Sequence, residues 1–384
     1  MTTSLLHKQF LQMEHELNQV HFERPDVIRS LLVALLARQH VVLLGPPGTG
    51  KSRLVRDLCQ RIVGQFFEWQ LTRMSTPEEL FGPISLQGLQ QDHYRRIATG
   101  KLPDAEIAYL DETFKASSAI LNTLLAAMNE RVFYNDGQAV PMPLQMLVGA
   151  SNELPEDRDE LGALWDRFLI RHVVEYVKDP ASFTALLQTV AHPSAHTTLT
   201  VADLAAAQKE VEAVDMSAIW PLLGQLRIEL AKQAVVASDR RWRQSIGVVQ
   251  SSAWMNGHQT ADASDATILQ HVLWDDPEQR LLVAKAVLML ISPFDQEAQD
   301  IIDDTRDVYQ RAIQSQVDST MAEQDKYTAG VEANTAIKIA GNRLKAIIKK
   351  AEDAGKPATR AQEGLNILVA WGSEILKTCL QITV

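Results

Sequence analysis

A glycine- and proline-rich turn that ends in Lys-Ser stands early in the chain, in the stretch VVLLGPPGTGKSRL. Its apolar start, Val41 to Leu44, predicts a short buried strand. The residues that follow fit the pattern G-x-x-x-x-G-K-S, in which glycines let backbone N–H groups converge on an anion. The segment from Arg53 to Ile62 predicts a helix whose positive end faces the same anion. A plain turn after a core strand would not explain this order, so the stretch predicts a P-loop that binds a nucleoside triphosphate.

Each residue of the P-loop has an expected role. Lys51 is expected to contact the β- and γ-phosphates, and the Ser52 hydroxyl is expected to ligate Mg²⁺. The rest of the nucleotide-binding turn comprises Gly45, Pro46, Pro47, Gly48, Thr49 and Gly50.

A second acidic element follows in the stretch AEIAYLDE. Ile107 to Leu110 predicts a strand, and Asp111 and Glu112 end it. Asp111 is expected to help hold Mg²⁺, and Glu112 to polarise the attacking water. Two acids after a strand are often only solvated residues. Their place after a P-loop favours hydrolysis of ATP over phosphoryl transfer to a metabolite, so ATP and Mg²⁺ are the expected cofactors.

Further polar residues follow the acidic pair. Asn152 comes just after a third predicted strand, Gln145 to Ala150, and is expected to contact the γ-phosphate and the attacking water, although such an Asn is often only a turn residue. Arg167 is expected to reach the neighbouring subunit's γ-phosphate and stabilise transition-state charge. Arg171 lies in a predicted strand, and we expect it to form a surface salt bridge.

A helix is predicted to begin within VVASDRRWRQSI, with Ser238 or Asp239 as its N-cap. Arg240 is then expected to approach the same ATP from a second, helical domain.

Taken together, these segments resemble MoxR-type AAA+ ATPases, and among them most closely the RavA-type regulatory variants. The matching text, within roughly residues 20 to 290, is LLGPPGTGKS, TRMSTPEELFGPISLQGL, YLDE, ILNTLLAAMNER, VGASNELP, LWDRFLIR and SDRRW. The resemblance implies Asn152 as sensor 1, Arg167 as the arginine finger and Arg240 as sensor 2. Because the last segment reads Ser-Asp-Arg-Arg where the wider family commonly has Ser-Pro-Arg, Arg241 remains an alternative to Arg240.

The resemblance also implies the fold class. It is an α/β protein with a P-loop AAA+ αβα sandwich and a parallel sheet, followed by an all-α lid and a C-terminal helical segment. The expected boundaries are 1–197, 198–295 and 296–384.

Two insertions are expected in the first domain. A capping box at Thr76–Glu79 predicts a short helix within Met74–Thr99, which looks like the family's helix-2 insertion. Alternating apolar residues around Asn135-Asp136-Gly137 predict a β-hairpin that resembles the hairpin before sensor 1. Ordinary loops are the alternative for both.

The lid and the C-terminal segment both show helical patterns. Thr200 to Asp203 is a further capping pattern at the start of the lid. Two sets of apolar or small residues then recur in steps of three and four, as expected for packed helices. They are Ile337, Ala340, Leu344, Ile347 and Ala351, and Leu365, Leu368, Gly372, Ile375, Cys379 and Ile382. This segment is either a plain helical hairpin that closes the lid or an element for oligomer or partner docking. The β-rich module of RavA-like proteins is not evident in it.

The composition limits the function classes. The net charge of −11 and the pI of about 5.4 argue against bulk nucleic-acid binding. Two distant cysteines, Cys59 and Cys379, predict neither a disulfide framework nor a zinc site. The N-terminus does not fit a signal peptide, and the longest apolar stretch is too short to span a bilayer. We therefore expect a cytoplasmic protein without membrane insertion.

The expected function is that of an ATP-hydrolysing ring motor, a homo-hexamer with chaperone-like action on a protein client. The resemblance implies a partner with a von Willebrand factor A domain. The alternative is a DNA-directed AAA+ motor or a nuclease-activating subunit, for which the sequence shows no Lys/Arg stripe with interleaved aromatics. A nucleotide-gated scaffold that hydrolyses little is a third possibility, which Glu112 and Arg167 argue against.

Overall fold

The structure, a computed structural model, describes residues 4–154, 158–188, 196–291, 293–317, 321–353 and 358–379. The chain divides into two compact units. The first comprises residues 1–221 and 234–280, and the second comprises residues 222–233 and 281–384.

Five parallel strands form the sheet of the first unit, in the order β3-β4-β7-β1-β8. They are β1 (His40–Leu44), β3 (Phe66–Gln70), β4 (Ile107–Asp111), β7 (Met146–Ser151) and β8 (Phe168–Val173). All residues of β1 and β7 are buried, because helices cover both faces of the sheet, and this explains their near-continuous apolar sequences. The carboxyl ends of β1, β4 and β7 share one edge of the sheet, and there the three predicted nucleotide motifs meet.

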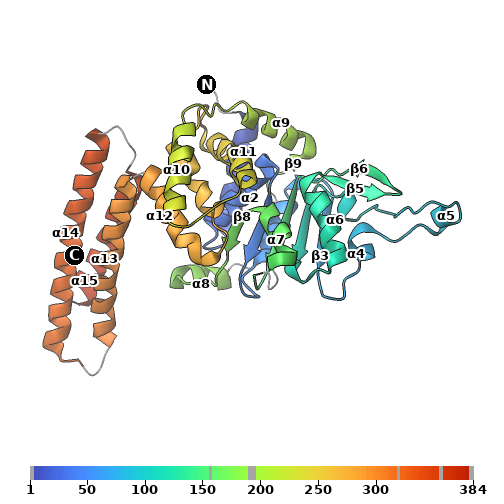
Figure 1. Cartoon of the computed structure of the whole chain (residues 1–384). Coiled ribbons are helices and arrows are strands. Elements are labelled where there is room, and N and C mark those ends of the chain that lie inside the picture. The colour runs from blue at the N-terminus through green and yellow to red at the C-terminus, as the bar shows by residue number, and fades with distance from the viewer. Residues whose placement is uncertain are drawn as a thin grey trace. The chain divides into compact units, whose positions relative to one another are not determined.

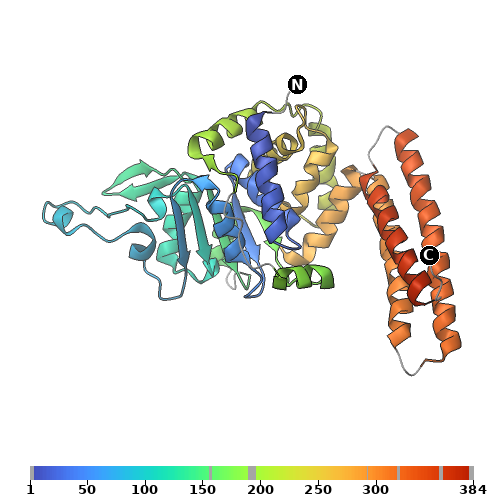
Figure 2. The ribbon, with the colours of Figure 1, turned by 180° about the vertical axis from the view of Figure 1, so that it is seen from behind.

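Helices cover the two faces of this sheet, which confirms the predicted αβα sandwich. One face carries α1 (Leu5–Val20), α2 (Pro25–Ala37) and α3 (Lys51–Cys59), and the other carries α6 (Ser118–Asn129) and α7 (Arg158–Arg167). The second set lies in front of the sheet in Figure 1, and α1 lies in front of it in Figure 2. Shorter elements are α8 (Pro180–Gln188), the paired strands β2 (Ile62–Val63) and β9 (Leu199–Thr200), and the 3₁₀ turns η1 (Leu102–Asp104) and η2 (Thr113–Lys115).

The predicted short helix within Met74–Thr99 is present as α4 (Pro77–Phe81), and a second short helix, α5 (Leu86–Leu89), follows it in this insertion. Thr76 is the N-cap of α4 and Pro77 its first residue, as predicted, but the capping box is wrong. The Thr76 side chain makes no capping hydrogen bond, and the Glu79 carboxylate instead accepts from the Trp69 indole at 3.1 Å. The Glu79 carboxylate thus bonds to Trp69 of β3 and not to the backbone of Thr76.

The predicted hairpin before β7 is confirmed as β5 (Val132–Asn135) and β6 (Gln138–Pro141). Its two turn residues, Asp136 and Gly137, have φ of 53° and 73°, the left-handed values of a type I′ turn. The turn also holds the insertion, since the Asn135 and Asp136 side chains accept the backbone N–H groups of Arg96 and Tyr94 at 2.7 and 2.9 Å.

The all-α lid region follows β9 and contains α9 (Val201–Glu212), α10 (Trp220–Lys232), α11 (Asp239–Asn256), η3 (Ala263–His271), η4 (Pro277–Gln279) and α12 (Arg280–Ile291). The predicted capping box of Thr200 and Asp203 is confirmed at the start of α9. Ser238 is the N-cap of α11, and its hydroxyl accepts the Arg241 N–H at 3.2 Å.

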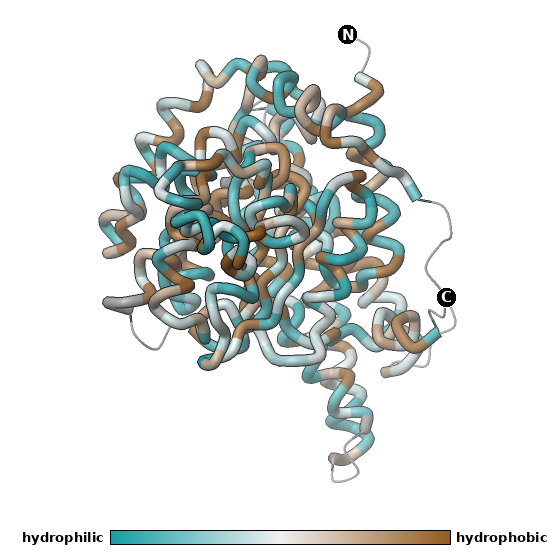
Figure 3. Tube along the Cα trace, turned by 90° about the vertical axis from the view of Figure 1, so that its right-hand side faces the viewer, coloured by the Kyte–Doolittle hydropathy of each residue, from teal (hydrophilic) through white to brown (hydrophobic). Residues whose placement is uncertain are grey.

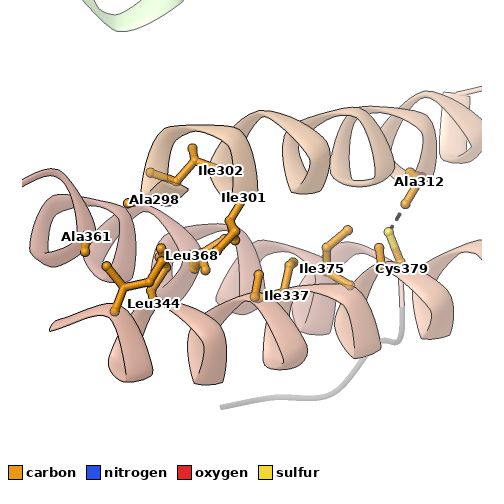
Figure 4. Packing of buried hydrophobic residues seen from close by; sticks show 13 residues of the cluster. Ala298, Ile301, Ile302, Ala312, Ile337, Leu344, Ala361, Leu368, Ile375 and Cys379 are labelled. Carbon is orange, nitrogen blue, oxygen red and sulfur yellow. Dashed lines mark hydrogen bonds between the residues drawn. The ribbon is translucent and has the colours of Figure 1, made fainter. Parts of the chain in front are cut away.

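Three long helices make up most of the second unit: α13 (Pro293–Val317), α14 (Glu323–Asp353) and α15 (Thr359–Thr378). They pack around a common core, so this segment is more than a two-helix hairpin (Figure 4). The predicted apolar positions of α14 are all buried, and on α15 Leu368, Ile375 and Cys379 are buried too. Ile382 lies outside the described residues. At Gly364 a Cβ would lie 2.6 Å from the Ile302 side chain, so a larger residue there would force this side chain to shift.

Hydrophilic and hydrophobic residues alternate along the helices, as Figure 3 shows, so most helices bury one side only. Within the described residues, no helix is both long enough and apolar enough to cross a membrane.

Candidate functional site

The P-loop joins β1 to α3 at the carboxyl edge of the sheet. Gly45, Gly48 and Gly50 have φ of 148°, 81° and 83°, values that residues with a Cβ rarely adopt. Gly45 also has no room for a side chain, because a Cβ there would lie 2.0 Å from the Val174 carbonyl oxygen. Its N–H donates to the Ser151 carbonyl at 3.0 Å, which fastens the loop to β7. The backbone path by itself therefore favours glycine at all three positions and leaves no room for a side chain at Gly45.

Lys51, the first residue of α3, points back into the loop. Its Nζ donates to the carbonyl oxygens of Gly45 at 2.6 Å and Pro46 at 3.0 Å, and the residue is only 8% exposed. Burial lowers the pKa of the Lys51 ammonium, while the Asp111 and Glu112 carboxylates raise it. The ammonium thus lies inside the turn that would hold the phosphates.

Ser52 and Asp111 provide the oxygen atoms expected for a magnesium site. The Ser52 hydroxyl lies 3.0 Å from the Tyr109 hydroxyl, and Tyr109 is fully buried in β4. Asp111 ends the same strand, and its Oδ1 accepts the Glu112 N–H at 3.0 Å. A serine hydroxyl and a carboxylate are hard oxygen ligands, so these residues fit Mg²⁺.

Glu112 and Asn152 meet across neighbouring strands. Asn152 Nδ2 donates to Glu112 Oε1 at 2.7 Å. Glu112 itself has φ of 52° and begins the turn η2, which directs its side chain away from the path of β4. Its Oε2 lies 3.2 Å from Lys115 Nζ but has no hydrogen bond of acceptable geometry, although the atom is buried. Asn152 therefore holds one carboxylate oxygen, and the Lys115 ammonium faces the other.

A cavity of about 380 Å³ opens beside the P-loop. Its apolar wall includes Val20, Phe22, Leu43, Tyr176, Phe183 and Leu186. The Tyr176 hydroxyl donates to the Pro47 carbonyl at 3.1 Å, which joins this wall to the P-loop. An apolar cavity that adjoins a phosphate-binding turn suits a flat aromatic base. Sequence analysis missed this wall, because its residues come from three separate segments that form no motif.

Arg167 and Arg240 lie near each other, apart from the P-loop and from Glu112. Arg167 ends α7, its guanidinium donates to the Ala163 carbonyl at 2.6 Å, and its buried Nε has no hydrogen-bond partner. Burial and the nearby Arg240 charge lower the pKa of Arg167. Arg240 is exposed, and its guanidinium lies 3.8 Å from the Asp166 carboxylate. Among the described residues, neither arginine has a hydrogen bond to the P-loop or to Glu112.

The two candidates for sensor 2 differ sharply. Arg241 is 3% exposed, and its guanidinium donates to the carbonyls of Leu169 at 2.9 Å and Val272 at 2.8 Å. These bonds tie α11 to β8 and to the segment after η3. Arg241 is thus held in the core by backbone carbonyls, whereas the neighbouring Arg240 is exposed and has the Asp166 carboxylate beside it at 3.8 Å.

Arg171 forms a salt bridge, as predicted, but its side chain is buried and does not lie at the surface. Arg171 is 0% exposed, and its guanidinium donates to the carbonyls of Trp165 and Trp274 at 3.1 and 2.5 Å and to the Asp275 carboxylate at 3.0 Å. It also lies over the Trp165 ring, 4.1 Å from the ring centre. Neighbours distant in sequence enclose this side chain, so its strand position alone could not reveal them.

Most of the chain matches two known protein families. Residues 8–214 match the family described as the MoxR domain in the MoxR-vWA-beta-propeller ternary systems, and residues 218–287 match an AAA lid domain. Two uncharacterized proteins of Methanocaldococcus jannaschii are similar along most of the chain. One is 37% identical over 78% of this chain and 78% of its own, and the other is 35% identical over 90% and 93%. Chaperone MoxR1 of Mycobacterium tuberculosis is 29% identical over 42% of this chain and 43% of its own.

A solved structure shows the same fold. The crystal structure of a proposed ATPase from Cytophaga hutchinsonii has a TM-score of 0.60 and covers 73% of this chain and 94% of its own. At 15% sequence identity this likeness concerns the fold alone.

Proposed function

Because the chain belongs to the MoxR family of AAA+ ATPases, we propose that it hydrolyses ATP and uses the turnover for chaperone-like remodelling of a protein client. The observation that carries the proposal is the Glu112 carboxylate. Asn152 holds one of its oxygens, the Lys115 ammonium lies 3.2 Å from the other, and the charge of Glu112 raises the pKa of Lys51 in the P-loop.

In this proposal the phosphates of ATP enter the turn that Lys51 now fills. The Lys51 ammonium would exchange the Gly45 and Pro46 carbonyls for phosphate oxygens, which are the stronger acceptors because they are charged. The N–H groups at the start of α3 would complete the cradle. The base would lie against the apolar wall of the adjoining cavity.

Glu112 would act on the attacking water. Asn152 would fix the direction of the carboxylate, and the oxygen that faces Lys115 would accept a water proton. The water oxygen would then bond to the γ-phosphorus while the bond from that phosphorus to the leaving oxygen of ADP breaks. Mg²⁺ held by Ser52 and Asp111 would neutralise charge on the phosphates. No protein nucleophile is needed, since phosphoryl transfer to water depends mainly on positioning and charge stabilisation.

Arg167 and Arg240 would complete the site from outside the P-loop. We assign Arg240 as sensor 2, since Arg241 is committed to backbone carbonyls in the core. We assign Arg167 as the finger that acts on the ATP of a neighbouring copy, which makes a homo-hexameric ring the working form. The Nε of Arg167 has no hydrogen-bond partner, and within the described residues its guanidinium bonds to Ala163 and not to the P-loop, which supports a role in trans.

We also propose a partner with a von Willebrand factor A domain. The matched family is described by its ternary systems with such a domain and a β-propeller, which supports this assignment. The finer likeness to RavA-type variants stays a prediction.

A mixing experiment tests the trans assignment. Arg167→Ala and Glu112→Gln chains should each be inactive alone. Mixed before assembly, they should regain ATP turnover, because an intact Arg167 can then serve a neighbour with an intact Glu112. Lys51→Ala chains mixed with Glu112→Gln chains are the control and should stay inactive, since neither chain has a complete nucleotide site. Absence of rescue at every mixing ratio would contradict the proposal.

A further inference from the structure

An uninterrupted group of cations covers the exposed side of α14. From residue 338 to residue 350 the helix contains five basic residues and no acidic one: Lys338, Arg343, Lys345, Lys349 and Lys350. All five are exposed, and none has an ion pair within the part of the chain that the structure describes. The buried residues of α14 lie on its opposite side, so these cations are not needed for the core. Such a patch is unexpected in a chain of net charge −11.

An acidic stripe lies on α13 of the same unit. Glu297, Asp300, Asp304 and Asp307 are exposed, and their spacing of three, four and three residues puts them on one side of the helix. Asp300 accepts a hydrogen bond from Gln296 at 2.8 Å. Neither this stripe nor the basic patch forms an ion pair with the other within one chain, as far as the described residues show.

Within the basic patch, Lys338, Lys345 and Lys349 lie on one side of α14 and form a basic stripe. This basic stripe matches the acidic stripe in length. At a rise of about 1.5 Å per residue, Glu297 to Asp307 extends about 15 Å, and Lys338 to Lys349 extends about 16 Å. The basic stripe also contains Ile339, whose side chain is 55% exposed and which can lose water on docking. Opposite charges and equal lengths on one unit are what a repeated contact between identical copies requires, since each copy offers one stripe to each neighbour.

We propose that the acidic stripe of α13 docks on the basic stripe of α14 of a second copy of this chain. The contact is head-to-tail, so it can continue around a ring. The proposed contact rests on the proposed function in one respect, that the chain works as a ring. It does not depend on ATP, because the charges of the two stripes are present with or without nucleotide. Exposed ion pairs are individually weak and screened by salt, so the contact is salt-sensitive and adds to others in the assembly.

A charge swap in the full-length chain tests this contact. The basic-stripe variant is Lys338→Glu, Lys345→Glu and Lys349→Glu, and the acidic-stripe variant is Glu297→Lys, Asp300→Lys and Asp304→Lys. Each variant alone brings like charges together, so its self-association constant should fall at least about tenfold. An equal mixture should recover wild-type association, because every contact in an alternating assembly then pairs opposite charges. The matched control is one triple variant that reverses three exposed lysines outside the two stripes: Lys8→Glu, Lys209→Glu and Lys377→Glu. It should associate like the wild type.

Carbodiimide cross-linking supplies a test that does not need ATP. In a mixture of isotopically labelled and unlabelled Lys51→Ala chains, we expect cross-links between chains that join lysines of α14 to carboxylates of α13, and their loss in high salt. If these cross-links form while wild-type chains fail to hydrolyse ATP, the contact stands and the proposed function fails. The proposed contact would be overturned, even if ATP is hydrolysed, if these cross-links do not form or if the mixed charge-swap variants do not regain association. It would also be overturned if the wild-type chain binds nucleic acid, the basic-stripe variant loses that binding, and its self-association is unchanged.

Discussion

Asn152 Nδ2 donates a hydrogen bond of 2.7 Å to Glu112 Oε1. The two residues follow β7 and β4, which are neighbours in the sheet, although they are 40 positions apart in the chain. The pairing of the strands therefore sets the position of one side chain relative to the other. A shift of either strand end would change the direction of the carboxylate.

Replacing Asn152 should separate ATP binding from turnover. In Asn152→Ala the Glu112 carboxylate loses its fixed direction, so the rate of hydrolysis should fall about 10- to 100-fold. The dissociation constant for ATP should change less than about threefold, because the P-loop is untouched. Turnover assays and ATP titration measure the two effects. Asn366→Ala, at an exposed position on α15, is the control. Wild-type turnover in Asn152→Ala would show that Glu112 does not need this bond.

The neighbouring arginines of α11 should respond in opposite ways. Arg241→Ala leaves several buried carbonyls without a donor and should lower the free energy of unfolding by about 3 kcal/mol. Arg240→Ala removes an exposed side chain, so it should change the free energy of unfolding by less than about 0.5 kcal/mol while lowering ATP turnover. Urea denaturation measures the free energy of unfolding of both variants, and ATPase assays measure their ATP turnover. A stable Arg241→Ala protein without ATPase activity, beside a fully active Arg240→Ala protein, would reverse the assignment of sensor 2.

His40 should make folding sensitive to mild acid. Burial lowers its pKa to about 4, and its ring accepts the Leu147 N–H at 3.0 Å and donates to the Met128 carbonyl at 2.9 Å. The unfolded chain takes up the proton near pH 6.5 and the folded chain only near pH 4, so stability falls as the pH drops between these values. From pH 7.5 to 5, this residue should cost about 2 kcal/mol.

The contribution of His40 can be isolated by substitution. His40→Gln should flatten the dependence of the urea midpoint on pH in this range, whereas His15→Gln, at an exposed position, should leave it unchanged. The same slope in wild type and His40→Gln would mean that other groups, such as His172 and His271, account for the effect.

Sequence patterns predicted the features whose cause is local. The P-loop, the strands that end at Asp111 and before Asn152, and the hairpin turn at Asp136 all follow from residue types at fixed spacing. The buried positions of α14 follow from helical periodicity in the same way. Each of these signals lies within a few residues of the feature it predicts.

Features that depend on distant neighbours could not be predicted. Arg171 is enclosed by Trp165 and Trp274, and nothing in the strand itself signals that enclosure. Thr76 is the N-cap of α4, but the capping box expected there does not form, and the Glu79 carboxylate has a partner in β3 instead. Tyr109, whose hydroxyl lies against Ser52, looked like an ordinary strand residue.

The most direct measurement compares ATP binding with single-turnover hydrolysis in wild type and Glu112→Gln. Glutamine keeps the shape of Glu112 and can still bond to Asn152 but cannot take the proton of the attacking water. The variant should bind ATP within about threefold of wild type and hydrolyse it at least about 100-fold more slowly. Lys51→Ala, measured beside it, should fail to bind ATP at all. Hydrolysis by Glu112→Gln at the wild-type rate would contradict the assignment of Glu112 as the base and, with it, the proposed mechanism.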